Sequence, residues 1–101
     1  MRLTPDQARA IFVATQEPAG TDARVRLFGS RLNDELRDGD IDLLEECPRQ
    51  VSRPVWLAAQ ITARLQRRLG DRRIDVLVID PATELEPVHR VAQAEGVLLH
   101  P

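Results

Sequence analysis

One segment constrains the fold of this chain more than any other, residues 72–80, "RRIDVLVID". It is short, rich in β-branched residues and nearly continuous in apolar side chains, which is typical of a well-buried strand. Longer segments with helical periodicity lie on either side, at 53–69 and 85–95. A buried strand between two helices predicts a sheet with helices packed against it. We therefore expect an α/β (α+β) fold.

Local signals predict the remaining elements. Thr4 and Pro5 are typical of a helix start, and Gly70 is placed to end the longest helix. A further short helix is expected after Ser30. The helices are predicted at 5–16, 53–69 and 85–95, and the strands at 23–28, 40–45, 72–80 and, at a sheet edge, 97–100. The helix 53–69 should bury an apolar stripe formed by Val55, Ala58, Ala59, Thr62, Leu65 and Leu69. The result is a mixed sheet of about four strands with helices packed on it.

Length and composition limit the class of protein. A chain of 101 residues, 43% hydrophobic and 30% charged, is expected to form a single globular domain over 1–101. No apolar run approaches the roughly 20 residues of a membrane span, and the N-terminus lacks a signal-peptide core. We therefore expect a cytoplasmic protein without membrane association. Three aromatic residues and no excess of positive charge argue against sequence-specific nucleic-acid binding. The lone Cys47 excludes an intramolecular disulfide.

Charge is unevenly distributed along the chain. Residues 34–46 hold seven acidic residues against Arg37 alone, a formal charge of −6 in a chain whose net charge is −2. Such density is tolerated if the acids are solvated or if a cation joins them. All fourteen basic residues are arginines. Any phosphate contact must therefore come from guanidinium groups and backbone N–H groups.

Asp40 and Asp42 are spaced i and i+2 on a predicted strand, so their side chains should point to one face. Two carboxylates so close together repel each other unless a cation lies between them. Mg²⁺ typically takes one or two carboxylates together with phosphate oxygens. This spacing therefore indicates a metal site, although "DGDID" by itself is more often a polar loop.

Two further features strengthen the metal hypothesis. Asp75 is the one acidic residue inside the apolar strand, and three carboxylates from adjacent strands can hold two ions for phosphoryl chemistry. Its alternative role is an ion pair with Arg72 or Arg73. Gly29 and Ser30 form a turn whose backbone could approach a phosphate closely.

Taken in order, these segments resemble a known signature. "LFGS" at 27–30 is followed after nine residues by "DIDLL" at 40–44, and "RIDVLVI" at 73–79 matches a third-carboxylate strand. This pattern resembles the DNA polymerase beta superfamily of nucleotidyltransferases. The small size resembles its minimal nucleotidyltransferases, the MNT-type domains. The closing "AEGVLLH" is similar to the short strand that often ends them.

The resemblance implies a role for each matching residue. Gly29 and Ser30 would hold the phosphates of the nucleotide, and the following Arg31 could contact a phosphate or face solvent. Asp40 and Asp42 would bind the metals, while Asp75 would complete the metal site and help to activate the attacking hydroxyl. The chain departs from the family in "LNDEL" at 32–36, where many relatives have small residues and a glycine.

The implied activity is Mg²⁺-dependent transfer of a nucleoside monophosphate, AMP from ATP or its counterpart from another NTP, to a hydroxyl. The resemblance further implies a protein acceptor, a HEPN-type toxin whose antitoxin this chain would be, in a hetero-oligomer. The chain has no tyrosine, so a tyrosine acceptor would have to lie on the partner. One alternative is an inactive binding module that neutralises or scaffolds a partner stoichiometrically. A weaker one is a transferase acting on a small molecule such as an aminoglycoside.

Overall fold

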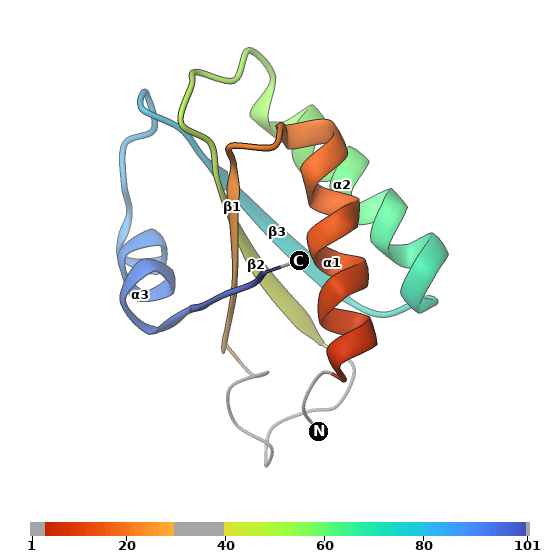
Figure 1. The fold of residues 1–101 in the computed structure, drawn as a ribbon. Coiled ribbons are helices and arrows are strands. Elements are labelled where there is room, and N and C mark those ends of the chain that lie inside the picture. The colour runs from red at the N-terminus through yellow and green to blue at the C-terminus, as the bar shows by residue number, and fades with distance from the viewer. Residues whose placement is uncertain (1–3, 30–39, 101) are drawn as a thin grey trace.

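The computed structural model describes residues 4–29 and 40–100. Within these ranges the chain forms three helices and four strands, and their order along the chain is the predicted one (Figure 1). They are α1 Pro5–Ala19, β1 Arg24–Phe28, β2 Ile41–Glu46, α2 Pro54–Leu69, β3 Ile74–Ile79, α3 Pro87–Glu95 and β4 Val97–Leu98. The short helix expected after Ser30 lies outside the described residues. The predicted α+β class is confirmed.

The four strands form one mixed sheet in the order β3-β2-β1-β4. β2 and β3 are parallel, whereas β1 is antiparallel to both β2 and β4. Helices α1 and α2 cover one face of this sheet, and α3 lies against the other (Figure 1). The mixed sheet predicted from the sequence is therefore confirmed, with β2 and β1 in its interior.

β3 differs from its prediction as a well-buried strand. It lies at an edge of the sheet and pairs with β2 on one side. Ile74 and Ile79 at its two ends are buried, the residues between Asp75 and Ile79 are half-buried, and Asp75 is exposed. The strand is apolar on both faces because helices cover both of them. One face of β3 packs against α2, and on the other face Leu77 and Ile79 of β3 join the apolar cluster beneath α3.

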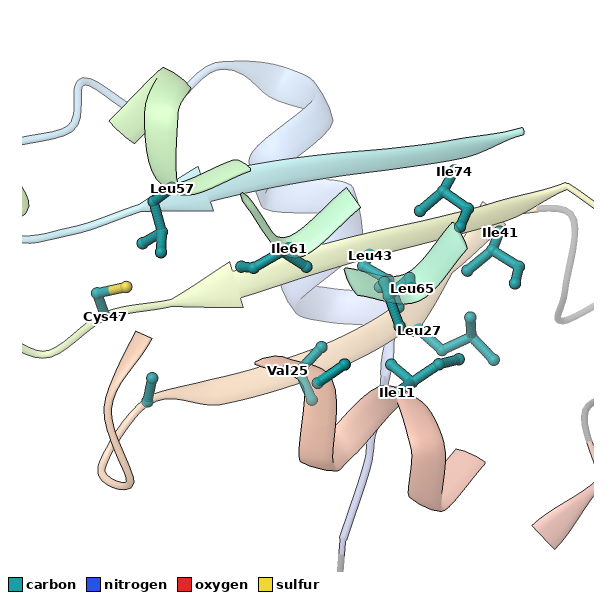
Figure 2. Packing of buried hydrophobic residues seen from close by; sticks show 12 residues of the cluster. Ile11, Val25, Leu27, Ile41, Leu43, Cys47, Leu57, Ile61, Leu65 and Ile74 are labelled. Atoms are coloured by element: carbon teal, nitrogen blue, oxygen red, sulfur yellow. The ribbon is translucent and has the colours of Figure 1, made fainter. Parts of the chain in front are cut away.

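Alternate residues of β2 enter two separate cores, as the two-residue period of a strand requires. The larger core lies between the sheet and helices α1 and α2, and Figure 2 shows its side chains converging from β1, β2 and both helices. Its fully buried members include Ile11, Ile41, Leu43, Ile61 and Leu65. The smaller core joins Leu44, Ile79 and Ala92 beneath α3. β2 is thus covered by helices on both faces.

The stripe predicted for α2 is wrong in part. The helix buries Leu57, Ile61 and Leu65, spaced by one turn each, while Val55 at its start is 86% exposed. Burial favours the row with the larger side chains because the free energy gained grows with the apolar area removed from water. Leu and Ile remove more area than the alanines and threonine of the predicted stripe.

Local capping accounts for the helix ends. At the start of α1 the Thr4 hydroxyl accepts a hydrogen bond from the Gln7 amide N–H at 3.1 Å, and the Gln7 side chain accepts one from the Thr4 N–H at 3.0 Å. These two bonds form a capping box, and the helix start predicted at Thr4 is confirmed. α1 ends at Ala19, three residues beyond the predicted end. None of the helices in the described part of the chain is both long enough and apolar enough to cross a membrane.

Candidate functional site

The candidate site lies where β2 begins. Asp40 directly precedes β2, and Asp42 is the second residue of the strand. Ile41 and Leu43, which alternate with them, are fully buried in the larger core. Because successive strand residues point to opposite faces, Asp40 and Asp42 lie in phase on the face that carries α3. Both aspartates are half-buried.

Asp75 is brought to the same place by strand pairing. β2 and β3 are parallel, and their register sets Asp42 directly beside Asp75. Residues in register on adjacent strands share a face and are separated by about 5 Å across the sheet. The aspartates singled out from two distant parts of the sequence are therefore neighbours on one sheet face.

Asp75 also has a basic neighbour on its own strand. Its Oδ2 lies 3.5 Å from Nε of Arg73, and the two side chains are 56% and 74% exposed. Exposed ion pairs of this kind contribute about 0–1 kcal/mol. A divalent cation would therefore meet little resistance in displacing Arg73 from this carboxylate. The alternative role foreseen for Asp75, an ion pair with a neighbouring arginine, is present in the structure.

Gly29 ends β1 beside the aspartates. Phe28 pairs with Asp42 across β1 and β2, and Gly29 follows it with φ +71°, in the region that favours glycine. A Cβ at this position would collide with the carboxylate oxygen Oδ2 of Asp42 and would lie 3.2 Å from its Cγ. Glycine is thus needed here for two reasons, the backbone conformation and the close approach of Asp42. Gly29 and the Asp42 carboxylate are therefore packed against each other.

Two residues predicted for phosphate binding cannot be placed. Ser30 and Arg31 lie outside the described residues, as does the divergent segment 32–36. Within the part of the chain that is described, no three or more His, Cys, Asp or Glu side chains are arranged so that they could hold a metal ion. Without a cation between them, like-charged carboxylates are held apart by repulsion. The backbone places the three aspartates together, but their side chains do not form a closed ligand set.

The four acidic residues of segment 34–46 that the structure describes lie at the two ends of β2. Asp40 and Asp42 lie at its start, whereas Glu45 and Glu46 lie at its end. Glu46 accepts a bond from Nε of Arg26 at 2.6 Å. Glu45 and Glu46 therefore lie away from the candidate site, and the charge of Glu46 is paired with that of Arg26.

Glu45 is a buried carboxylate with a shifted pKa that the sequence analysis did not single out. Its side chain is 1% exposed, and Oε1 has no hydrogen-bond partner in the described structure. Burial, followed by the charge of Glu46, raises the pKa of Glu45 to about 8. The sequence did hold a signal, because Glu45 continues the core-facing alternation of Ile41 and Leu43.

Cys47, directly after β2, is a free, buried cysteine. Burial, then the charges of Glu45, Asp80 and Asp22, raises the pKa of the Cys47 thiol to about 11. A thiol so hard to ionise is a poor nucleophile and a poor metal ligand. Cys47 therefore serves as a small core residue, as its position at a strand end suggests.

No protein-family model matches the chain, and no curated protein matches it either. The resemblance to nucleotidyltransferases therefore stays a prediction based on the motif.

Proposed function

We propose that this chain is a Mg²⁺-dependent nucleotidyltransferase of the minimal, MNT-type class. The observation that carries the proposal is the register of β2 and β3, which sets Asp42 beside Asp75. Gly29 supports the proposal as well, because this residue, directly after β1, packs against the Asp42 carboxylate. A shared sheet face is what two metal-binding carboxylates on separate strands require.

The residues fit a hard divalent cation. Asp40, Asp42 and Asp75 offer carboxylate oxygens, the ligand type that Mg²⁺ prefers, and Gly29 lets the Asp42 carboxylate approach the backbone closely because it has no Cβ. When bound, Mg²⁺ would neutralise phosphate charge and polarise the α-phosphoryl group. Asp40, directly before β2, and Asp42, on β2, would hold it together with Asp75 of β3.

The chain's own residues would divide the remaining work. Ser30 and Arg31 would contact the phosphates, together with the backbone of Gly29. Asp75 would accept the proton of the acceptor hydroxyl while the oxygen of that hydroxyl forms a bond to the α-phosphorus. The bond from that phosphorus to its bridging oxygen breaks, and pyrophosphate leaves. ATP or another NTP is the donor, and AMP or its counterpart is transferred.

We further propose that the acceptor hydroxyl belongs to a partner protein. The motif resemblance supports a HEPN-type toxin, with this chain as its cytoplasmic antitoxin in a hetero-oligomer. The chain contains no tyrosine, so a tyrosine acceptor has to be supplied by the partner.

A second candidate, a catalytically inactive binding module, is favoured by the ion pair between Arg73 and Asp75. If Arg73 is a permanent partner, the third carboxylate is structural. The chain would then neutralise its partner by contact alone.

Metal binding is the first test. Calorimetry with Mn²⁺ and a non-hydrolysable ATP analogue should give saturable binding, which Asp42→Asn abolishes and Asp75→Asn weakens. Glu84→Gln removes an exposed carboxylate outside this set and should bind as the wild type does. Equal binding by Asp42→Asn would disprove the site.

Transfer is the second test. ATP radiolabelled at the α-phosphate should label a HEPN-type protein encoded beside this chain, and the double change Asp40→Asn with Asp42→Asn should end labelling. If the double variant still protects cells as well as the wild type does, and the wild type labels nothing, the binding-module function replaces the transferase.

A further inference from the structure

Helix α2 presents a partly apolar face to solvent. Trp56, the only tryptophan of the chain, is 54% exposed, and Val55 beside it is 86% exposed. Both lie in the first turn of α2, on the helix layer that also contains α1 (Figure 1). Large side chains left in water at adjacent positions commonly mark an interaction surface.

The surface around Trp56 is shaped as well as apolar. A hollow runs along the helix and is lined by Trp56, Ala59, Gln60, Ala63, Arg64 and Arg67. A second hollow, at the start of the helix, shares Trp56 and Ala59 with the first and is also lined by Arg53, Pro54 and Val55. We call these two hollows together the α2 outer face. The small alanines leave room beside the ring, so another helix could pack its ridges there.

The guanidinium group of Arg53 lies over the indole ring of Trp56. Its guanidinium carbon lies 5.3 Å from the centroid of the Trp56 ring, within range of a cation–π interaction. Tryptophan and arginine are the residues that most often dominate the binding energy of interfaces. The α2 outer face therefore contains, in Trp56 and Arg53, the two residue types that a strong binding site commonly depends on, in addition to exposed apolar area.

The positive charge of this face indicates what kind of partner can bind there. Residues 52–70 contain four arginines, Arg53, Arg64, Arg67 and Arg68, and no carboxylate. Arg64 is paired with Glu17 of α1 at 3.0 Å, which leaves Arg53 and Arg67 as the charged rim of the hollows. A second copy docking by the same face would set arginine against arginine, which is unfavourable.

We propose that the α2 outer face binds an amphipathic helix of a partner protein. Its apolar residues would cover Trp56 and Val55, and its flanking carboxylates would pair with Arg53 and Arg67. A protein is favoured over single-stranded nucleic acid because the face offers one aromatic ring amid alanine and valine, rather than several rings for successive bases. The inference does not depend on the proposed transferase, because Asp42 and Asp75 lie on the opposite face of the sheet.

Fluorescence of Trp56 tests the proposal directly, since no other tryptophan contributes. The probe is a synthetic, tryptophan-free amphipathic helical peptide with leucines on one face and glutamates beside them. It should shift the emission of Trp56 to shorter wavelength in a saturable manner, and its Kd should rise by about tenfold or more in Arg67→Glu. The same peptide with lysines in place of glutamates should bind the wild type weakly and Arg67→Glu more tightly. Val91→Ser, on the exposed side of α3, is the matched control and should bind as the wild type does.

Three results would overturn the proposal. The first is that the glutamate peptide binds no more tightly than the lysine peptide, whether both bind equally or neither shows saturable binding. The second is binding of an oligothymidine that is tighter than that of the peptide, which would indicate nucleic acid. The third is self-association in sedimentation runs that Trp56→Ala abolishes, which would make a second copy the occupant. Circular dichroism checks that Trp56→Ala folds, as expected for an exposed residue.

Discussion

Replacing Glu45 by glutamine should change how the stability of this protein depends on pH. Glu45 is almost wholly buried, at 1% exposure, and the pKa of its carboxyl group is raised from an ordinary 4.5 to about 8. The folded chain therefore keeps a proton that the unfolded chain releases across this range. Stability contributed by the protonated group is fully present below the unfolded pKa and is lost as pH rises toward the folded pKa.

The magnitude follows from the shift itself. One pKa unit corresponds to about 1.4 kcal/mol, so the wild type should lose about 3 to 4 kcal/mol of unfolding free energy from about pH 5 to about pH 8 through this group. Such a loss is a large fraction of the roughly 5–15 kcal/mol that stabilises a small domain. Glutamine has nearly the same shape and does not ionise, so Glu45→Gln should lack this loss. The thiol of Cys47 does not interfere, because its pKa of about 11 lies above the window.

Urea unfolding of both proteins at several pH values measures the effect. The free-energy difference between Glu45→Gln and wild type should grow in favour of the variant as pH rises. Glu84→Gln changes an exposed carboxylate and should run parallel to the wild type throughout. If the Glu45→Gln and wild-type curves are also parallel, the carboxyl group ionises normally and the reasoning from burial fails.

Two pairs of substitutions test the packing. Gly29→Ala should destabilise the chain by about 1–2 kcal/mol, and by more than Gly70→Ala does, because both glycines have positive φ but only the first would push a methyl group against Asp42; equal losses in urea unfolding would argue against that contact. Ile61→Ala should cost about 2–5 kcal/mol because the side chain is fully buried, whereas Val55→Ala should cost close to nothing; a large loss for Val55→Ala would restore the stripe predicted from the sequence.

Local patterns in the sequence were sufficient for the order of the elements and for the class of fold. The spacing of Asp40 and Asp42 predicted that they share one face of a strand, and the alternating Ile41 and Leu43 do enter the core on the other face. Helix signals at Thr4 and Gly70 correctly marked a start and an end. These features depend on backbone geometry within a few residues, so a short stretch of sequence contains all the information that they require.

The candidate site was predicted in part. The sequence indicated that Asp40 and Asp42 share a face, and the motif pointed to Asp75. Strand register, which sets Asp42 beside Asp75, and the contact between Gly29 and Asp42 join residues that lie far apart in the chain. No local periodicity specifies which strands pair, or in which register.

Tertiary packing alone decided three things: that β3 lies at the sheet edge, which row of α2 faces the core, and that helices cover the face of β2 on which Glu45 lies. α2 carries two rows of apolar residues, and its periodicity is compatible with burying either. The row with Leu57 and Ile61 is buried because it removes more apolar area from water against the sheet, and Trp56 is left outside. Glu45 is carried into the same core by its place on β2, because the alternation of a strand gives its side chain no other direction.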